Sequence, residues 1–348
     1  MKAAVLENKR VLTYQDVPLP EPAPGHVRLK IKAVSICGSD IKRYIDGHRM
    51  YPLILGHESA GIIDLVGEGL SKKYLGKHAA VIPLVPCFKC EQCQRGFYSA
   101  CHNYSFIGSR QSGCFAEYVE LPEKNLLIVP EKLSFERAAM IEPSTVARHM
   151  LDLGGFKKGQ TAIVLGAGSI GLMVVQWLRI LGAEKIIVTD ILDENLQIAS
   201  RLGAHVTINP VKVDLDKEVR KLVGDGADLT LEATGLPQVL EQTLSITRPR
   251  GKVVLAGNQP LDKSLPLVFI ENMMRREISL IGCFMSYSAP FPGHEWTDTV
   301  EALLKGSLDI DTIISHRYPL SEAPEVFEKI GAHQLAHQKI VLIPEAAS

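Results

Sequence analysis

Four cysteines lie close together in one segment of the chain, at positions Cys87, Cys90, Cys93 and Cys101. Their C-x2-C-x2-C-x7-C spacing lets four thiolates on one loop surround a single Zn²⁺ ion tetrahedrally. A closed shell of four sulfur atoms leaves no coordination position for a substrate, so the pattern predicts a structural zinc. A zinc ribbon that binds nucleic acid normally has two separated C-x2-C pairs on a basic module, which this segment lacks.

Other side chains that can bind a metal or move a proton are dispersed along the first half of the chain. Cys37 stands in a Cys-Gly-Ser-Asp sequence, His57 and Glu58 in a Gly-His-Glu sequence, and Glu142 directly before a proline. Each is a weak indication by itself. A lone cysteine or histidine beside glycine is more often structural than catalytic, and a surface glutamate is usually only solvated.

A glycine-rich turn follows the apolar run 161–165 and precedes an apolar helical pattern that Gly182 can end. The order of strand, turn and helix is that of a dinucleotide-binding unit, in which the first glycine permits a tight turn. The second lets the backbone approach a pyrophosphate, and the third lets helix and strand pack closely, while the helix N-terminus offers free amides. The residues predicted to bind the cofactor here are Gly166, Gly168, Ser169, Ile170 and Gly171.

Asp190 ends the next apolar run and lies 22 positions after Gly168. That spacing is near the one at which a carboxylate accepts hydrogen bonds from the hydroxyls of an adenosine ribose. The same carboxylate would repel a 2′-phosphate, and the following Ile191 and Leu192 supply no arginine to receive one. We therefore expect NAD in preference to NADP.

The composition is that of an ordinary globular protein, with 46% hydrophobic and 22% charged residues in 348. A net charge of −1 gives no electrostatic reason to expect nucleic acid or an anionic membrane as a partner. No apolar run reaches the ~18 residues that span a bilayer, and the N-terminus carries charges where a signal peptide needs apolar residues. We expect a cytoplasmic protein that acts on a small molecule.

Two kinds of pattern divide the chain. Residues 1–150 are rich in proline, glycine and β-branched residues, and runs such as Val27–Val34 alternate with period two, which predicts a β-barrel. Residues 151–285 alternate short apolar strands with helices, which predicts a doubly wound parallel sheet. Thr234 and Gly257 follow two of these strands, at the edge where a cofactor binds such sheets. Residues 286–348 end in another strand, and we expect them to complete the barrel.

Together, the motifs resemble the zinc-dependent medium-chain alcohol and polyol dehydrogenases. The Cys-Gly-Ser-Asp, Gly-His-Glu, four-cysteine and Gly-Ala-Gly-Ser-Ile-Gly segments come in the family's order, over a correspondence from Met1 to about Pro344. The resemblance implies a GroES-like catalytic barrel, a Rossmann-type sheet, NAD and two zinc ions per chain, one catalytic and one structural. It also implies a homodimer or homotetramer, for which the apolar strand predicted at 278–284 offers a sheet edge.

For the dispersed residues, the resemblance implies a catalytic zinc held by Cys37, His57 and Glu142. Glu58 either stands behind the ion or exchanges with water as a ligand, and the sequence leaves both alternatives open. Three protein ligands leave a position for a substrate oxygen, where zinc acts as a Lewis acid on a hydroxyl. Ser39 matches the family's hydroxyl that hydrogen-bonds the reacting oxygen.

The proton's further path departs from the family pattern. Several relatives have a histidine five residues after the ligand cysteine, where this chain has Lys42. A cationic lysine is a poor proton acceptor at neutral pH. Water, the cofactor ribose and His48 remain as alternative routes.

Three stretches, 97–99, 104–110 and 285–296, resemble a branch of the family that oxidises a polyol phosphate to a ketose phosphate. Arginine is suited to grip such a phosphate, and Arg110 is the first candidate, followed by Arg43 and His294. The alternatives are a solvated loop arginine and an unphosphorylated polyol such as sorbitol or xylitol. The alternative from another class is a catalytically silent NAD-binding protein, which would be expected to have lost zinc ligands that this chain retains.

Overall fold

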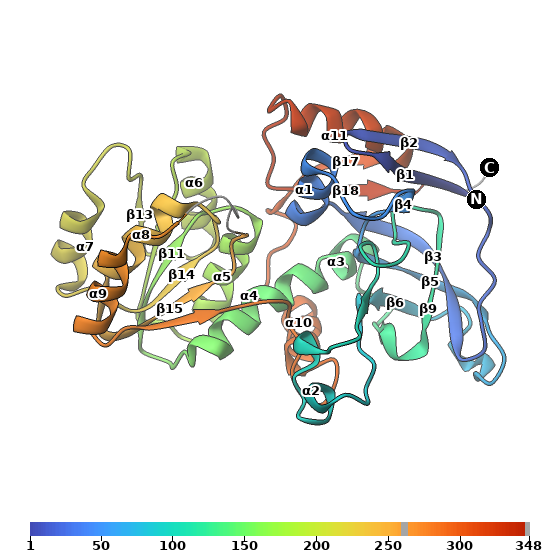
Figure 1. Ribbon diagram of the computed structural model, residues 1–348, viewed down its shortest axis with the longest axis horizontal. Coiled ribbons are helices and arrows are strands. Elements are labelled where there is room, and N and C mark those ends of the chain that lie inside the picture. The colour runs from blue at the N-terminus through green and yellow to red at the C-terminus, as the bar shows by residue number, and fades with distance from the viewer. Residues whose placement is uncertain (259–263, 345–348) are drawn as a thin grey trace. The chain divides into compact units, whose positions relative to one another are not determined.

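The computed structural model describes residues 1–258 and 264–344 (Figure 1). The chain divides into two compact units, which we describe separately. The first comprises Met1–Pro143, Tyr287–Leu304 and Ile310–Ser348, and the second comprises Ser144–Ser286 and Lys305–Asp309. The first division falls inside a helix at Pro143, somewhat before the boundary expected at residue 150.

The first unit is built on a seven-stranded, mostly antiparallel sheet with the order β10-β6-β5-β3-β18-β17 and β9 paired to β3. The last strand of the chain inserts between β3 and β17, antiparallel to the former and parallel to the latter. Both ends of the sequence therefore build this unit. Its sheet strands are β3 (His26–Ser35), β5 (Glu58–Val66), β6 (His78–Val81), β9 (Tyr118–Pro122), β10 (Leu126–Ile128), β17 (Ile314–Pro319) and β18 (Lys339–Ile343).

Smaller elements complete the first unit. A three-stranded sheet has the order β2-β1-β4, and β7 pairs with β8. These strands are β1 (Lys2–Asn8), β2 (Val11–Asp16), β4 (Leu53–Ile54), β7 (Leu84–Val85) and β8 (Ser105–Phe106). The helices are α1 (Gly38–Asp46), α2 (Glu91–Gln94), α3 (Phe135–Ala139), α10 (His294–Leu304) and α11 (Ala323–Gly331).

Alternation along β3 explains how the sequence forms this core. Side chains at every second position of the strand are buried, among them Val27, Leu29 and Ile31, because successive residues of a strand face opposite sides. They join one hydrophobic cluster with Phe115 and with Phe327 of α11. The period-two prediction for this strand is thereby confirmed.

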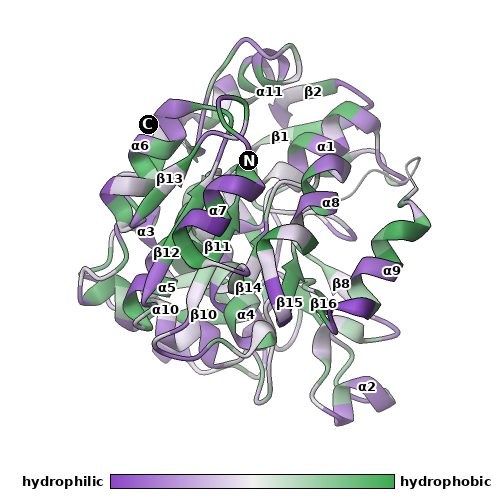
Figure 2. Cartoon of the chain, turned by 90° about the vertical axis from the view of Figure 1, so that its left-hand side faces the viewer, coloured by the Kyte–Doolittle hydropathy of each residue, from purple (hydrophilic) through white to green (hydrophobic). Residues whose placement is uncertain are grey.

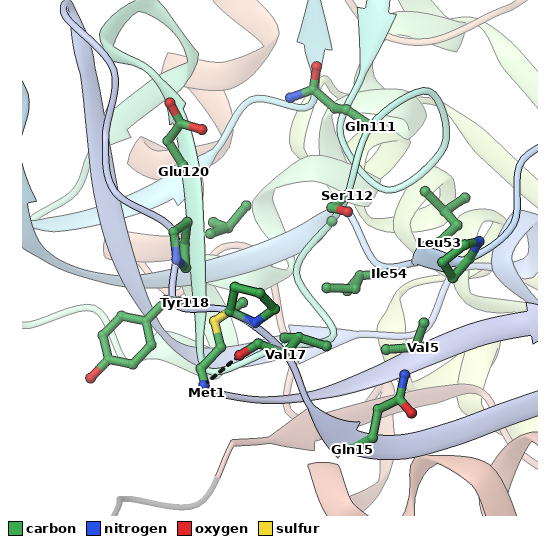
Figure 3. A pocket seen from close by; sticks show the side chains of 15 residues that line it. Met1, Val5, Gln15, Val17, Leu53, Ile54, Gln111, Ser112, Tyr118 and Glu120 are labelled. Atoms are coloured by element: carbon green, nitrogen blue, oxygen red, sulfur yellow. Dashed lines mark hydrogen bonds between the residues drawn. The ribbon is translucent and has the colours of Figure 1, made fainter.

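The first unit also contains a cavity of about 400 Å³ (Figure 3). Apolar side chains such as Val5, Val17 and Ile54 line it, with Gln111 and Glu120 on its border. None of the residues predicted to bind metal, cofactor or substrate belongs to its lining. The cavity is therefore not the predicted active site.

The second unit is a six-stranded parallel sheet with the order β13-β12-β11-β14-β15-β16. The order reverses between β11 and β14, the topological switch point at which doubly wound sheets bind ligands. The strands are β11 (Thr161–Leu165), β12 (Lys185–Thr189), β13 (Val206–Ile208), β14 (Ala227–Glu232), β15 (Thr247–Leu255) and β16 (Ser279–Gly282). The predicted parallel sheet is confirmed.

Helices accompany these strands as the sequence predicts. Figure 2 shows β11 and β12 in the green of hydrophobic residues, as expected of strands buried on both faces. Three of the helices that alternate with the strands begin at Asp193, Leu215 and Pro237. The helices are α4 (Ile141–Gly154), α5 (Ser169–Ile180), α6 (Asp193–Leu202), α7 (Leu215–Val223), α8 (Pro237–Ile246) and α9 (Leu267–Arg275).

Two sequence patterns differ in detail from the elements that they form. The helical pattern over residues 134–153 forms two helices, separated at Met140, because Pro143 has no N–H to bond the carbonyl of Ala139 and is tolerated only in the first turn of a helix. The run with strand character that starts at Phe115 forms a strand only from Tyr118. The residues before it hydrogen-bond instead to β1 and to the segment after β4. Within the described residues, no helix is both long and apolar enough to cross a membrane.

Candidate metal centres and cofactor site

Cys37 is the N-cap residue of α1, and its backbone is extended (φ −88°, ψ 148°). Its N–H donates to Oδ2 of Asp40 at 3.2 Å, while the N–H of Ser39 lies 3.5 Å from its Sγ. This capping box holds the sulfur over the first turn of the helix, where backbone amides and the positive end of the helix dipole face it.

His57 directly precedes β5, and its ring lies close to the sulfur of Cys37. The preceding Gly56 has φ +89°, and a Cβ there would lie 2.4 Å from the ring of Phe115, so only glycine fits. Sγ of Cys37, a ring nitrogen of His57 and a carboxylate oxygen of Glu58 all lie within 4.8 Å of one another. Ligands about 2.0–2.3 Å from one zinc ion are separated by less than that limit, so the donor set fits zinc.

Asp40 lies directly behind this group and is fully buried. Its Oδ1 is 3.5 Å from Nδ1 of His57 and 3.3 Å from Nη1 of Arg43. A carboxylate beside one imidazole nitrogen fixes the ring and leaves the other nitrogen for a metal. Burial opposes the charge on His57, but Asp40 and Cys37 outweigh it and raise the pKa of His57 well above its ordinary value.

The two candidate carboxylates differ in their partners. Glu58 receives both Lys339, with Nζ 2.8 Å from Oε1, and a hydrogen bond from Ser35 to Oε2. Glu142, at 9% exposure, comes from the start of α4 and is not in the group that lies within 4.8 Å. Burial is the main cause that raises its pKa to about 7. His57 opposes this rise and Glu58 adds to it, so a cation here would stabilise the ionised carboxylate.

The hydroxyl of Ser39 lies beside the sulfur of Cys37. Its Oγ donates to Sγ of Cys37 at 3.3 Å and accepts from Nη1 of Arg43 at 2.8 Å. Lys42, at the family's relay position, is half exposed with its Nζ 4.0 Å from Asp46. Nδ1 of His48 accepts from the N–H of Met50 at 3.2 Å.

The residues proposed to grip a phosphate are each held by a local partner. Arg110 donates from Nη1 to the carbonyl of Tyr104 at 3.0 Å, and its guanidinium carbon lies 3.7 Å from the centre of the Tyr104 ring. Nδ1 of His294 lies 3.2 Å from Asp298. Arg43 is engaged by Ser39 and Asp40.

The four clustered cysteines come together around α2. Their sulfur atoms all lie within 4.8 Å of one another, and Sγ of Cys90 is 3.8 Å from Sγ of Cys101. Zinc–sulfur bonds of about 2.3 Å in a tetrahedron place the sulfurs about 3.8 Å apart, so the cluster fits a zinc ion. Backbone N–H groups, first that of Cys93 and then that of His102, are the main cause that lowers the pKa of Cys90 to about 6.

An aromatic cluster holds this cysteine loop within the first unit. The ring of Phe291 lies 5.3 Å from those of Phe88 and Tyr98, with edge-to-face geometry, and stacks on Tyr287 at 5.6 Å. The phenol oxygen of Tyr287 in turn accepts from the N–H of Leu84 at 3.1 Å. Segments 87–101 and 287–291 are therefore joined by ring contacts.

The glycine turn of the second unit has the predicted local geometry. Gly166 has φ +94°, and a Cβ on Gly171 would lie 1.9 Å from the carbonyl oxygen of Gly166. Gly168 has no heavy atom within 4 Å of such a Cβ, which leaves its backbone open to a ligand. Asp190 accepts from the N–H of Ala167 at 2.8 Å, so the acidic residue contacts the turn directly. Ser169 begins α5, whose N-cap is Gly168.

The loops after β14 and β15 lie against each other. A Cβ on Gly257 would be 2.0 Å from the backbone nitrogen of Gly235, so this approach requires glycine. Buried Glu232 organises the turn, because its Oε1 accepts from the N–H groups of Thr234 at 2.6 Å and of Gly235 at 2.9 Å. Thr234 also packs on the first loop, since a Cβ on Gly166 would meet its methyl group at 2.6 Å.

Asp40, Glu232 and Lys339 are not among the predicted site residues. For Glu232 and Lys339 the available signal was a charged residue in an apolar strand, which implies a buried partner. Lys339 precedes Ile-Val-Leu-Ile, and Glu232 ends Leu-Thr-Leu. The identity of that partner depends on the tertiary fold.

A GroES-like barrel unit with a cysteine–histidine–carboxylate cluster, together with a Rossmann-type sheet, defines the medium-chain dehydrogenase class. Residues 23–131 match the alcohol dehydrogenase GroES-like domain, and residues 169–305 match the zinc-binding dehydrogenase domain. The chain therefore belongs to the zinc-dependent alcohol dehydrogenase family.

The similar proteins include enzymes of polyol metabolism. The chain is 35% identical to galactitol 1-phosphate 5-dehydrogenase of Escherichia coli (strain K12), over 99% of this chain and 100% of that protein. It is 32% identical to a sorbitol dehydrogenase of Bacillus subtilis (strain 168), over 99% and 97%. The crystal structure of galactitol-1-phosphate dehydrogenase from Escherichia coli has a TM-score of 0.94 at 34% identity, covering 99% of this chain and 100% of that one.

Neighbours with bound cofactors contain both forms of the dinucleotide. A putative zinc-binding dehydrogenase from Sinorhizobium meliloti 1021, bound to NADP, has a TM-score of 0.90 at 30% identity and covers 99% of each chain. An Escherichia coli CFT073 dehydrogenase complexed with NADH has a TM-score of 0.89 at 30% identity, with the same coverage.

Proposed function

We propose that this chain is a zinc- and NAD-dependent dehydrogenase that oxidises a secondary alcohol of a polyol phosphate, such as galactitol 1-phosphate, to the ketose phosphate. One observation carries the proposal: a thiol, an imidazole and a carboxylate converge within 4.8 Å beside the hydroxyl of Ser39. Such a set binds zinc and leaves a coordination position open for a hydroxyl.

Two zinc ions per chain follow from the two donor sets. Cys37 and His57, with a carboxylate, would hold the catalytic ion, and the four-cysteine loop would hold the structural ion. Glu58 is the carboxylate that lies within 4.8 Å of Cys37 and His57. Both of its oxygens already receive Lys339 and Ser35, so we retain Glu142, which lies outside that group, as the third ligand once zinc is bound. Glu58 then supplies negative charge behind the ion. Glu142→Gln and Glu58→Gln test this assignment, since only loss of the true ligand should remove the catalytic zinc.

In the reaction, the alcohol loses a hydride and a proton and becomes a ketone. Bound zinc supplies Lewis acidity toward the substrate hydroxyl, and NAD accepts the hydride. The side chains of this site orient the reacting groups: Ser39 hydrogen-bonds the reacting oxygen, and Asp40 fixes the ring of His57.

The preference for NAD rests on Asp190 and on the residues after it. Its Oδ2 accepts from Ala167 in the glycine turn and its Oδ1 from Leu192, which holds the carboxylate at the end of β12. An anion at this place favours ribose hydroxyls over a 2′-phosphate. Gly166, Gly168, Gly171, Thr234 and Gly257 would contact the remainder of the cofactor.

The substrate assignment rests on the similarity to galactitol 1-phosphate 5-dehydrogenase and on stretches 97–99, 104–110 and 285–296. Similarity to sorbitol dehydrogenase favours an unphosphorylated polyol as the second candidate. The test is NADH formation by the zinc-loaded protein with galactitol 1-phosphate, galactitol and sorbitol in parallel. Turnover confined to the phosphorylated polyol supports the first assignment, and equal or faster turnover of free polyols supports the second. A zinc-loaded protein that binds NAD and oxidises no alcohol would be the silent dinucleotide-binding relative.

We also propose that the chain forms a homodimer or a homotetramer. β16 is an edge strand of the six-stranded sheet, and exposed apolar side chains follow it and lie on α9. Leu267 is 85% exposed, Met274 65% and Phe284 61%. A second copy would cover this edge, which otherwise invites uncontrolled pairing. Sedimentation gives the oligomeric state. The use of cysteine for metal in place of disulfides fits a reducing compartment, for which we propose the cytoplasm.

A further inference from the structure

One nitrogen of Arg43 contacts two residues at the start of α1. Nη1 lies 2.8 Å from Oγ of Ser39 and 3.3 Å from Oδ1 of Asp40. The three residues stand at positions i, i+1 and i+4 of the helix, so the arginine lies on the face that carries both partners. Its side chain is 20% exposed and that of Asp40 is fully buried.

The contact with Arg43 determines the direction of the Ser39 hydrogen bond. A guanidinium only donates, so Oγ of Ser39 must accept from Arg43. The single hydrogen of the hydroxyl is then left for another acceptor, which here is Sγ of Cys37 at 3.3 Å. A substrate oxygen bound beside Cys37 could receive the same hydrogen.

The contact between Arg43 and Asp40 also involves His57, because Asp40 lies between the two side chains. Asp40 lies 3.5 Å from Nδ1 of His57 through the same oxygen that faces Arg43, and its other oxygen accepts from the N–H of Cys37 at 3.2 Å. The guanidinium thus supplies the opposite charge that a fully buried carboxylate needs.

We propose that Arg43 is a positioning residue of the dehydrogenase site and not a phosphate ligand: it orients the hydroxyl of Ser39 as a donor toward the reacting oxygen and holds Asp40 behind His57. The inference rests on the proposed function, in that Ser39 must contact the reacting oxygen. It also narrows the proton's path. Arg43 cannot accept a proton at physiological pH and Lys42 pairs with Asp46, which leaves water, the cofactor ribose and His48 as routes for the proton released from the alcohol.

The test compares Arg43→Ala and Arg43→Lys with Arg49→Ala, which removes an exposed arginine from the loop after α1. Steady-state kinetics with a phosphorylated and a free polyol separate kcat from KM. For Arg43→Ala we expect kcat to fall about 10- to 100-fold on both substrates, because a hydrogen-bond donor to the reacting oxygen is misaligned. KM should change by less than about threefold. Guanidinium ion should restore part of kcat, Arg43→Lys should retain more activity than Arg43→Ala, and Arg49→Ala should behave as wild type.

A second measurement follows zinc release to a chelator and needs no turnover. Arg43→Ala should release one of its zinc ions several-fold faster than wild type. The effect should be smaller than the loss of about 10- to 100-fold that is typical when a direct partner of a metal-binding histidine is removed. Arg43→Gln serves for the same comparison if Arg43→Ala does not fold.

Two results would overturn the assignment of Arg43. One is an unchanged kcat. The other is an increase in KM that is confined to the phosphorylated polyol, which would make Arg43 a phosphate ligand. If the wild-type protein oxidises no polyol, the proposed function fails, but the role of Arg43 can still be tested by zinc release. Faster release from Arg43→Ala than from wild type supports the positioning of Asp40 by Arg43, and equal release overturns it.

Discussion

Nζ of Lys339 lies 2.6 Å from Oε2 of Glu58, and the two side chains are only 3% and 1% exposed. Lys339 begins β18 and Glu58 begins β5, so the pair joins the last strand of the barrel unit to the residue beside His57. Nζ also donates to the carbonyl of Ile36 at 3.1 Å. Burial opposes the charge on Lys339, but Glu58 and then Cys37 raise its pKa above the ordinary value.

Replacing Lys339 should therefore cost more stability than removing a surface ion pair. Lys339→Met leaves Glu58 buried without its cation, and we expect the free energy of unfolding to fall by about 3–5 kcal/mol. Lys329→Met is the matched control, because its pair with Glu325 is exposed and screened by solvent, so its loss should cost little stability. Urea unfolding of both variants gives the comparison. Similar losses in the two would show that the buried pair contributes no special stability.

The Glu58–Lys339 pair is a part of the site that could not be predicted from the sequence. Glu58 was identified beside His57 in a short local motif, whereas its partner is 281 positions away. The contact exists because β18 pairs with β3, which in turn pairs with β5. Nothing local to Lys339 indicates that neighbour. The same limitation left Glu58 and Glu142 unresolved, because the spacing of two glutamates does not say which of them the fold brings to a metal.

The two predicted zinc ions should be separable by mutation. Cys37→Ser should remove the catalytic ion and abolish turnover with little loss of fold, whereas Cys90→Ser should remove the structural ion and lower the melting temperature. We expect metal analysis to give about two zinc ions per wild-type chain and about one in each variant. Full activity in Cys37→Ser would eliminate the catalytic-zinc assignment.

The aromatic contacts of the cysteine loop predict a second source of its stability. Phe291→Ala removes a ring that touches Phe88 and Tyr98, and we expect a loss of about 1–3 kcal/mol in unfolding free energy. Gly96→Val should destabilise the same contact, since Gly96 has φ +82° and a Cβ there would lie 2.7 Å from Cβ of Ala289. Gly69→Val is the control, because its φ is also positive (+84°) but a Cβ would meet nothing within 4 Å. If the two glycine variants lose the same stability, the packing against Ala289 contributes nothing beyond backbone strain.

An ion pair of the first unit gives a pH-dependent prediction. Nε of Arg137 lies 3.3 Å from Oδ1 of Asp311, and this hydrogen-bonded arginine is the main cause that lowers the pKa of Asp311. A carboxyl pKa that is lower in the folded state contributes stability that is present above the unfolded pKa of about 3.9 and is lost as the pH falls through the folded value. The side chain is 51% exposed, so the contribution is below about 1 kcal/mol.

Asp311→Asn should therefore lower the unfolding free energy at pH 7 by less than about 1 kcal/mol. The difference from wild type should shrink as the pH falls below about 4 and should also shrink in high salt. Urea unfolding at pH 7, 5 and 3 measures it. A difference that stays constant across this range would mean that the substitution is unfavourable for reasons other than the lost charge.

The fold itself was more accessible to sequence reasoning than the site, because each strand and helix carries a local pattern. β11 has the bounds of the apolar run 161–165, and the strand expected within residues 286–348 is observed as β18. The errors arose where a single residue or a distant strand decides the outcome. Pro143 interrupts an otherwise helical pattern, and residues before Tyr118 pair with β1 rather than extending β9.

Asp190 offers a test of cofactor selectivity that also separates binding from structure. Asp190→Ala should weaken NAD binding and relax discrimination against NADP, because it removes the acceptor for the ribose hydroxyls and the charge that repels a 2′-phosphate. The carboxylate also accepts from Ala167 and Leu192, so part of any loss could reflect a disordered turn.

Asp190→Asn keeps an acceptor oxygen and removes the charge. We therefore expect Asp190→Asn to gain relative activity with NADP while it unfolds at nearly the wild-type temperature, and Asp190→Ala to lose affinity for both cofactors. The ratio of kcat/KM for NAD and NADP gives the answer, and an unchanged ratio in both variants would remove Asp190 from the cofactor site.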